Sequence, residues 1–390
     1  MEEKENKKTI RTFAAASFLN DFGSDIIYPI WPLFLTTVLG ANMAVLGFID
    51  GLGDALVSIS QAISGYVSDK IRRRKVFVWI GYLCGGTSRI GYAVSVVWQH
   101  IIPFRILDRA GKMRGAPRDA IIADASTNQN RGRNFGLLRA MDNLGAVCGI
   151  ILCIICFWYL NIGYRELFLF ASIPSFMAVI LVIFLIKERK LETKQLFKGL
   201  SFRDLNRNFK FFLLLSAIFA LGSFSYSFLL IYAKQYGFGV VFVPVLYLVF
   251  TVFAAVFSYP FGRLADRIGR KIVVLIGYLF WVIVCLIFIF IQSFWLIVLT
   301  FVLYGLHRAS LEPVQKTLVS ELAPSEYRAS SLGGYQMVVG LCAFPASLMA
   351  GVLWESVGIQ APFYLSLVLT IVSSLLLILF VKEQRQVNSG

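Results

Sequence analysis

The stretch from Phe104 to Asp124 concentrates ionisable side chains in an otherwise apolar sequence. It carries five basic and three acidic side chains, whereas 58% of all residues are hydrophobic and 15% are charged. An ionisable group inside a bilayer is costly unless it pairs with another group or faces an internal aqueous cavity. We therefore interpret this stretch as the polar centre of a membrane transporter.

A regular α-helix would divide these charges between two faces. At about 100° per residue, one stripe contains Arg105, Asp108, Arg109, Lys112 and Asp119. Arg114 and Arg118 then lie on the opposite side, toward neighbouring helices or the cytoplasmic surface. The stripe would face a central cavity. The alternative is a structural ion-pair network without a ligand, because buried ions are tolerated when they are paired.

The composition of the whole chain favours an integral membrane protein. Its 390 residues contain recurring hydrophobic runs, and a run of about 20 residues can cross a hydrocarbon core about 30 Å thick. No polar stretch is long enough for a separate soluble domain. The formal charge of +15 comes mostly from Lys and Arg between the hydrophobic runs. This placement follows the positive-inside rule and argues against nucleic-acid binding.

We predict an all-α polytopic membrane protein with twelve transmembrane helices. The expected spans are 12–38, 43–67, 75–98, 100–124, 133–158, 164–186, 210–233, 239–262, 271–292, 294–318, 329–354 and 361–381. Residues 1–186 would form an N-terminal six-helix bundle and 210–390 a C-terminal one, joined by a basic cytoplasmic linker at 187–209. The charged segment Met1–Lys8 is expected to be disordered. Basic connections alternate with connections that lack Lys and Arg, so both termini should lie on the cytoplasmic side of the inner membrane.

The two halves of the chain repeat each other at an offset of 197 residues. The segment Gly65–Arg74 follows the second span, and the similar segment Gly262–Lys271 follows the eighth. Asp69 and Asp266 hold the same place in the two copies. Two six-span units in the same orientation are typical of parallel repeats related by an axis normal to the membrane.

These segments resemble the signature loop of the major facilitator superfamily, G-x-x-x-D-[RK]-x-G-R-[RK]. The first copy has Arg72 where the family usually has Gly. The segment Arg105-Ile-Leu-Asp108-Arg109-Ala-Gly111 is similar to the family's fourth-span motif R-x-x-Q-G-x-G, with Asp for Gln and Arg for the first Gly. The resemblance covers the whole chain and implies the major facilitator fold, with two parallel six-helix repeats.

The resemblance also implies a cytoplasmic gating motif. Its residues are Gly65, Asp69, Arg73, Gly262, Asp266 and Arg270. Asp69 would lie at the N-terminus of span 11 and Asp266 at that of span 5, where the helix dipole favours a negative charge by about 0.3–1 kcal/mol. The alternative is that the basic residues of these loops only set the topology.

Several ionisable side chains share one depth in the membrane at a rise of about 1.5 Å per residue. Those nearest the middle of their spans are Asp25, Asp54, Arg89, Lys112, His307 and Arg308. Facilitator folds bind substrate at this depth. The candidate substrate and proton pathway comprises these six residues together with Asp21, Asp142, Arg105, Asp108 and Arg109.

Asp25 is our candidate proton carrier. Movement of the first span relative to Lys112 or Arg89 would change its contact with a cation, and with it the affinity of the carboxylate for a proton. A permanent Asp25–Lys112 or Asp25–Arg89 pair that only holds helices together is the alternative. For His307, a proton relay and a satisfied interior histidine are both open.

The sequence therefore predicts a secondary active transporter of a small, amphipathic or anionic solute, working by alternating access. We expect proton coupling and, by family analogy, export. No nucleotide-binding loop of the form G-x-x-x-x-G-K-[ST] occurs. Neither a cofactor nor a metal is expected, and the partners would be the solute, protons and the bilayer around a monomer. The alternatives are a receptor that binds without transport and an intramembrane lipid-modifying enzyme.

Overall fold

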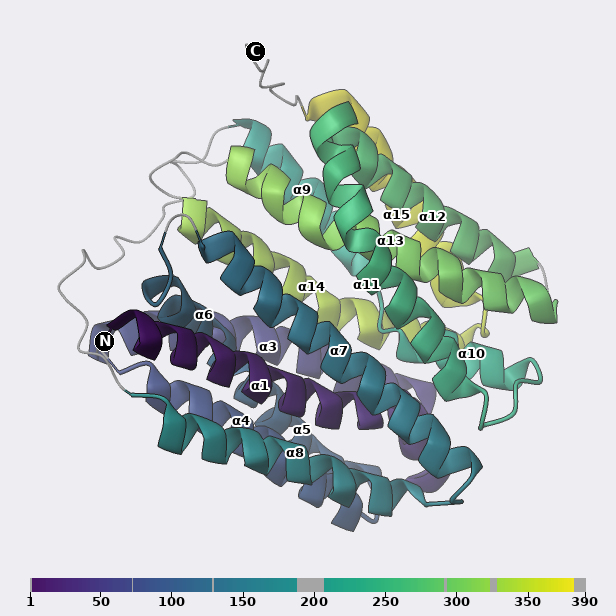
Figure 1. Cartoon of the computed structure of the whole chain (residues 1–390). Coiled ribbons are helices and arrows are strands. Elements are labelled where there is room, and N and C mark those ends of the chain that lie inside the picture. Colours follow the sequence, from purple (N-terminus) through teal and green to yellow (C-terminus); the bar gives the residue numbers. More distant parts are fainter. Residues whose placement is uncertain are drawn as a thin grey trace. The chain divides into compact units, whose positions relative to one another are not determined.

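The computed structural model describes residues 2–71, 73–127, 130–187, 207–290, 293–322 and 328–381. Within these ranges the chain is helical and contains no β-strand (Figure 1). The linker prediction at 187–209 falls mostly outside the described residues.

Among the residues that the structure describes, ten helical segments form the first half of the chain. They are α1 (Glu2–Ile27), α2 (Trp31–Leu33), the π-helical η1 (Phe34–Val38), α3 (Met43–Ile71), α4 (Lys75–Val94), α5 (Trp98–Ala110), the 3₁₀-helical η2 (Gly111–Arg114), α6 (Gly115–Asp124), α7 (Arg131–Trp158) and α8 (Tyr164–Leu185). The helix α1 begins at Glu2, so the expectation of disorder is wrong for residues 2–8, and Met1 lies outside the described residues.

Seven helices follow in the described part of the second half. They are α9 (Arg207–Gly222), α10 (Ser227–Gln235), α11 (Val243–Ile268), α12 (Arg270–Phe290), α13 (Phe294–Leu322), α14 (Arg328–Ser356) and α15 (Ala361–Phe380). Among the described residues, nine helices are long and apolar enough to cross a membrane, with α9 and α10 counted as one. The other three expected spans correspond to α1, α4 and the α5–α6 segment, whose polar and charged residues lower their hydropathy.

Two of the expected spans are interrupted at equivalent places. In the first span, α1 ends at Ile27 and α2 begins at Trp31, around Pro29 and Pro32, which lack the amide hydrogen that a helix needs. In the seventh span, the break lies between Gly222 and Ser227. The two breaks are offset by 195 to 196 residues, close to the 197-residue repeat, so the repeat extends from sequence to backbone.

The fourth span is also irregular, which corrects the helical wheel used for its charges. The helix α5 passes into the 3₁₀ turn η2 at Gly111 before α6 begins at Gly115. A 3₁₀ helix has about 3.0 residues per turn, so side chains after Gly111 are rotated away from their positions on a regular wheel. The stripe is therefore continuous for Arg105, Asp108 and Arg109. Lys112, near the start of the turn, remains within electrostatic range of Asp108, but the stripe does not extend unchanged to Asp119.

The chain forms two compact units. Unit 1 contains residues 1–41, 52–197 and 239–245, and unit 2 contains residues 42–51, 198–238 and 246–390. In unit 1, α1 packs on α7 and α8, and α4 packs on α8 and α5. In unit 2, α12 packs on α13 and α15, while α9 packs on α14 and α15.

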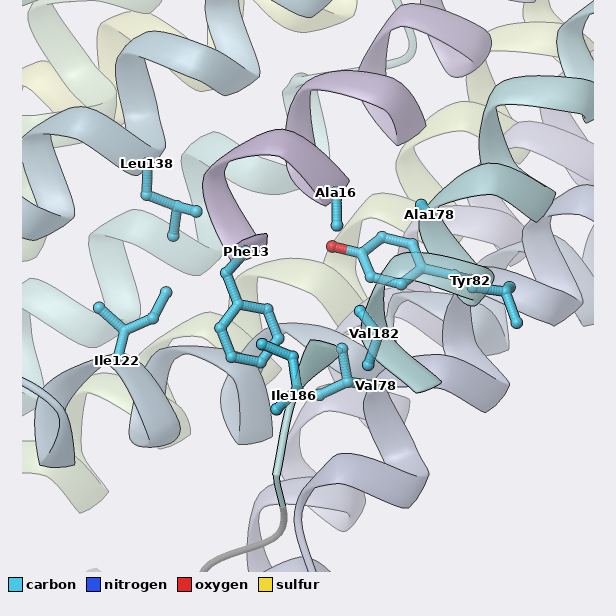
Figure 2. Close-up of a cluster of buried hydrophobic side chains, with 10 residues drawn as sticks. Phe13, Ala16, Val78, Tyr82, Ile122, Leu138, Ala178, Val182 and Ile186 are labelled. Carbon is cyan, nitrogen blue, oxygen red and sulfur yellow. The ribbon is translucent and has the colours of Figure 1, made fainter. Parts of the chain in front are cut away.

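An apolar core holds the helices of unit 1 together (Figure 2). It gathers side chains from α1, α4, α6, α7 and α8, among them Phe13, Val78, Ile122, Leu138 and Val182, all nearly or fully buried. Tyr82 lies in the same cluster, and the guanidinium of Arg114 lies over its ring, 4.9 Å from the ring centroid. This core fixes the helices that carry the charged side chains described next.

Candidate functional site

Arg89 is buried at the junction of α1, α4 and α8, with 2% of its surface exposed. Its guanidinium donates to the carbonyl oxygen of Ala171 at 2.5 Å and to Ser175 Oγ at 2.6 Å, both on α8. It also donates to the carbonyl oxygen of Asn20 at 3.3 Å and to Ser24 Oγ at 2.8 Å, both on α1. Arg89 thus joins three helices through neutral groups.

Asp108 and Arg109 form the polar centre of α5. The Nε of Arg109 lies 3.7 Å from Asp108 Oδ2, and Ser88 Oγ donates to Asp108 Oδ1 at 3.5 Å. Each side chain of the Asp108–Arg109 pair is 11% exposed. Asp108 also interacts electrostatically with Arg105, Lys112 and Arg89. One carboxylate is therefore surrounded by four cations.

Two aromatic rings from the break after α1 lie against the guanidinium groups of α5. Arg105 lies 4.3 Å from the centroid of Trp31, and Arg109 lies 5.4 Å from that of Tyr28. Trp31 is fully buried, whereas Tyr28 is half-buried. The irregular backbone after Ile27 places these rings beside the charges, and the sequence pattern did not reveal this contact.

The helix α3 contributes Gly53 and Asp54 to the same cluster. A Cβ atom at Gly53 would lie 3.1 Å from Arg105 Nε and 3.2 Å from both Cγ and Nε of Arg109. The absence of a side chain at Gly53 thus allows both arginines to approach α3 closely. Asp54, the next residue, interacts electrostatically with Arg109.

A second polar group lies on α1, α6 and α7. The guanidinium of Arg118 donates to Ser17 Oγ at 2.7 Å and to Asp119 Oδ1 at 3.0 Å. It also lies 3.8 Å from Asp142 Oδ1, and it interacts electrostatically with Asp21. The structure therefore brings Asp21 and Asp142 to Arg118 rather than to Arg109.

Asp25, on α1, is buried, with 8% of its surface exposed.

In unit 2, His307 packs among aromatic rings. Its Nδ1 lies 2.8 Å from the carbonyl oxygen of Gly277, and Trp281, Tyr304 and Phe219 lie with ring centroids 5.3, 5.9 and 5.9 Å away. Because a carbonyl oxygen only accepts, Nδ1 must carry the hydrogen in this bond. The next residue, Arg308, pairs with Glu312 one turn along α13, and both side chains are partly exposed, at 46% and 41%.

Asp50 is a polar residue that the sequence reasoning did not assign to the site. Its Oδ2 accepts hydrogen bonds from Ser225 Oγ at 2.8 Å and Ser227 Oγ at 2.5 Å, and the residue is 2% exposed. Both serines lie at the break between α9 and α10, and Asp50 belongs to the part of α3 that is included in unit 2. Nothing in the local sequence identified this long-range contact.

The two copies of the loop segment, Gly65–Arg74 and Gly262–Lys271, in which we predict a gating motif, form similar contacts within each unit. In unit 1, Arg74 pairs with Asp124 at the end of α6, at 2.6 Å. In unit 2, Arg270 pairs with Asp266 at 3.1 Å and with Glu321 on α13 at 2.9 Å. Gly65 and Gly262 lie on α3 and α11, and Arg73 is exposed. The side chain of Asp69 lies outside the described residues.

Lysines that begin the third and ninth spans cap helix ends in the same way. Lys75 Nζ donates to the carbonyl oxygen of Ile183 at 2.8 Å near the end of α8. Lys271 Nζ donates to the carbonyl oxygens of Ile378 at 2.9 Å and Val381 at 2.8 Å near the end of α15. A cation at the carboxyl end of a helix is favoured by the helix dipole.

Among the described residues, no group of three His, Cys, Asp or Glu side chains gathers as metal ligands do.

The all-helical fold, the backbone repeat and the buried charges define a polytopic membrane transporter. The family profile described as Major Facilitator Superfamily matches residues 13–254 and 211–390, so the chain belongs to this superfamily. It is 37% identical to the "uncharacterized MFS-type transporter MJ1317" of Methanocaldococcus jannaschii over 383 residues, covering 96% of each chain.

Two further comparisons report a more distant relative and a solved structure of similar fold. It is 24% identical to the quinolone resistance protein NorA of Staphylococcus aureus, covering 94% of this chain and 95% of that protein. Its fold matches the crystal structure of a D-xylose-proton symporter with a TM-score of 0.78 at 16% identity, covering 96% of this chain and 98% of the symporter. The expected family and fold are therefore confirmed. Because the family consists of transporters, the alternative of a lipid-modifying enzyme is removed.

Proposed function

We propose that this protein is a proton-coupled secondary active transporter that exports a small solute across the cytoplasmic membrane. It would act as a monomer with both termini in the cytoplasm, opening alternately to the two sides. The observation that carries the proposal is the charged cluster of unit 1, where α1, α3, α4, α5 and η2 bring ionisable groups together. Charges inside a membrane are retained where they serve substrate or ion pathways.

The direction of transport rests on a weaker observation. The relative from Staphylococcus aureus is described as a quinolone resistance protein, and resistance of that kind is consistent with removal of the compound from the cell. We extend this direction to the present chain as part of the proposal. A receptor that binds the same solute without moving it is the remaining alternative.

The coupling role assigned to Asp25 provides the direct test. The protein is reconstituted in proteoliposomes, and uptake of a solute identified by a thermal-shift screen is measured with and without a pH gradient. Asp25→Asn should lose gradient-driven transport but keep solute binding, since a neutral amide cannot carry the proton. The control is Glu5→Gln, which removes a carboxylate paired with the exposed Lys187 at 2.8 Å.

Three outcomes separate the possibilities. Gradient-driven transport by a well-folded Asp25→Asn variant would exclude the carrier role of Asp25. Loss of stability in the same variant would instead indicate a structural ion pair, because a cation would be left without its partner. Saturable binding by the native protein without any counterflow would favour the receptor.

A further inference from the structure

The charged cluster of unit 1 contains a cation that its surroundings do not neutralise. Among the residues that the structure describes, Lys112 makes no hydrogen bond and no ion pair, although it lies within electrostatic range of Asp108. Its side chain is partly accessible. An ammonium group inside a membrane without a bonded partner is costly unless it faces water or a ligand.

Arg109 also has a hydrogen-bond donor that no described group satisfies. Its Nε atom is buried and has no hydrogen-bond partner among the described residues, because Asp108 Oδ2 at 3.7 Å is too far for a hydrogen bond. A buried donor without a partner costs free energy unless a ligand or water satisfies it. Arg109 also stands where the family motif has a glycine, so this cation is an addition to the family pattern.

The balance of charge around these two residues is positive. Asp108 interacts with Arg109, Arg105, Lys112 and Arg89 together, and Asp54 adds a second carboxylate facing Arg109. Asp21 also interacts with Arg89, so these four cations share three carboxylates. The remaining positive potential favours an anion over a neutral or cationic solute.

The ring beneath Arg109 indicates the rest of the ligand. The guanidinium of Arg109 lies 5.4 Å from the centroid of Tyr28, and the Tyr28 residue is only half-buried. A guanidinium stacked on a ring keeps its in-plane N–H groups available for a planar acid group. An acid group near Lys112 and Arg109 would therefore place an attached apolar body beside Tyr28.

We propose that Arg109 and Lys112 bind the carboxylate or phosphate group of an organic anion whose apolar part contacts Tyr28. This inference rests on the proposed transport function, since it names the class of the solute. Gly53 contributes by letting Arg105 and Arg109 approach α3, so its role is to position the guanidinium groups rather than to contact the anion.

The test uses the full-length protein in lipid nanodiscs and four related probes. Benzoate and phenyl phosphate carry the two acid groups, benzamide is neutral, and benzylammonium is cationic. Thermal unfolding is followed at increasing concentration of each probe, and the dependence of the unfolding temperature on concentration gives the affinity. Benzoate or phenyl phosphate should stabilise the protein at millimolar concentration, and benzamide and benzylammonium should not. The stronger of the two anions identifies the acid group.

Matched variants locate the binding. Lys112→Gln and Arg109→Gln should each weaken anion affinity about tenfold or more, as expected for a hydrogen bond to a charged group. Lys112→Arg should retain most of it because the charge is kept. The control is Arg165→Gln, which removes a cation that donates to the carbonyl oxygen of Ala93 at 2.5 Å, away from the cluster.

Four results would overturn the proposal: stabilisation by neither anion, equal stabilisation by benzamide, stronger stabilisation by benzylammonium, or unchanged anion affinity in both Gln variants. If a variant unfolds at a lower temperature without ligand but keeps its anion affinity, its cation is structural. The test does not depend on flux. Anion binding without transport would contradict the proposed function alone, whereas proton-coupled transport of a cation would contradict this inference alone.

Discussion

At the scale of single residues, Arg89 shows how a candidate pathway residue can instead hold the helices together. All four of its described hydrogen bonds end on neutral oxygen atoms of α1 and α8. Gly23 makes room for this contact, because a Cβ atom there would collide with the Arg89 guanidinium and lie 2.5 Å from the Ala171 carbonyl oxygen. The Arg89 side chain therefore fills a site built for its planar shape.

We expect Arg89→Lys to destabilise the protein rather than to change its chemistry. An ammonium group cannot reach oxygen atoms on both flanking helices, so buried acceptors would lose their donor at a cost of about 1–3 kcal/mol each. Thermal unfolding in detergent measures this loss. If the variant instead keeps native stability and loses transport, Arg89 acts in the substrate or proton pathway rather than in holding the helices together.

His307 leads to a similar prediction. Its Nδ1 hydrogen is engaged by the Gly277 carbonyl oxygen, and its ring is stacked at 30° to Trp281. We expect His307→Phe to keep the aromatic packing and lose one hydrogen bond, about 1 kcal/mol of stability, while proton-coupled transport continues. Transport rates measured across a pH series check this. Loss of the coupling with intact folding would instead favour a proton relay.

At the scale of helices, the break between α9 and α10 depends on a contact from a distant part of the chain. Ser225 and Ser227 both donate to Asp50 Oδ2, and the amide of Ser225 donates to Ser347 Oγ at 3.2 Å. Helix breaks inside a membrane are tolerated where side chains satisfy the freed polar groups. Asp50 thus satisfies hydroxyl groups at a point where the regular helix ends.

This arrangement predicts different effects for two substitutions of Asp50. Asp50→Asn keeps an oxygen acceptor and should change stability little, whereas Asp50→Leu should cost about 1–3 kcal/mol for each hydroxyl left without a partner. Unfolding of the triple variant Asp50→Leu, Ser225→Ala, Ser227→Ala tests the cause. Removal of all partners should recover much of the loss, and additive losses would contradict the hydrogen-bond explanation.

The helices also show what the sequence could predict. Hydrophobic runs and the positive-inside pattern predicted the spans, and the repeated loop motif predicted the family, because both signals are carried by short stretches of sequence. The wheel placed Arg118 off the stripe, toward neighbouring helices, and its partners Ser17 and Asp142 lie on two of them. These particular partners could not be predicted, since the wheel assumed a regular helix and the 3₁₀ turn at Gly111–Arg114 changes the rotation. The contacts of Trp31, Tyr28 and Asp50 depend on helix breaks and long-range packing, which have no local sequence signal.

At the scale of the whole molecule, the repeat extends from residues to interactions. Asp124 and Glu321 stand 197 residues apart, and each pairs with an arginine of its own copy of the motif, Arg74 or Arg270. Lys75 and Lys271 cap the ends of α8 and α15 in the same manner. Similar contacts in both units indicate that the two halves share one way of securing the ends of their helices.

The repeated contacts lead to a prediction about gating rather than folding. Asp266 is 68% exposed and Glu321 is 30% exposed, and exposed ion pairs contribute about 0–1 kcal/mol to stability. Asp266→Asn and Glu321→Gln should therefore unfold at nearly the native temperature. If the motif controls the cytoplasmic gate, both variants should nevertheless slow transport, and Asp69→Asn should do the same in the first copy.

The measurement combines flux with labelling of single cysteines placed on the two membrane faces. Weaker cytoplasmic contacts should increase labelling from the cytoplasmic side. They should also lower the transport rate, because a transporter whose cytoplasmic side closes less often completes fewer transport cycles. The conservative variants Asp124→Glu and Glu321→Asp preserve charge and serve as matched controls, so they should stay close to native rates. If Asp69→Asn and Asp266→Asn both leave accessibility and rate unchanged, the basic loops only set the topology, and the conformational change must be controlled elsewhere in the molecule.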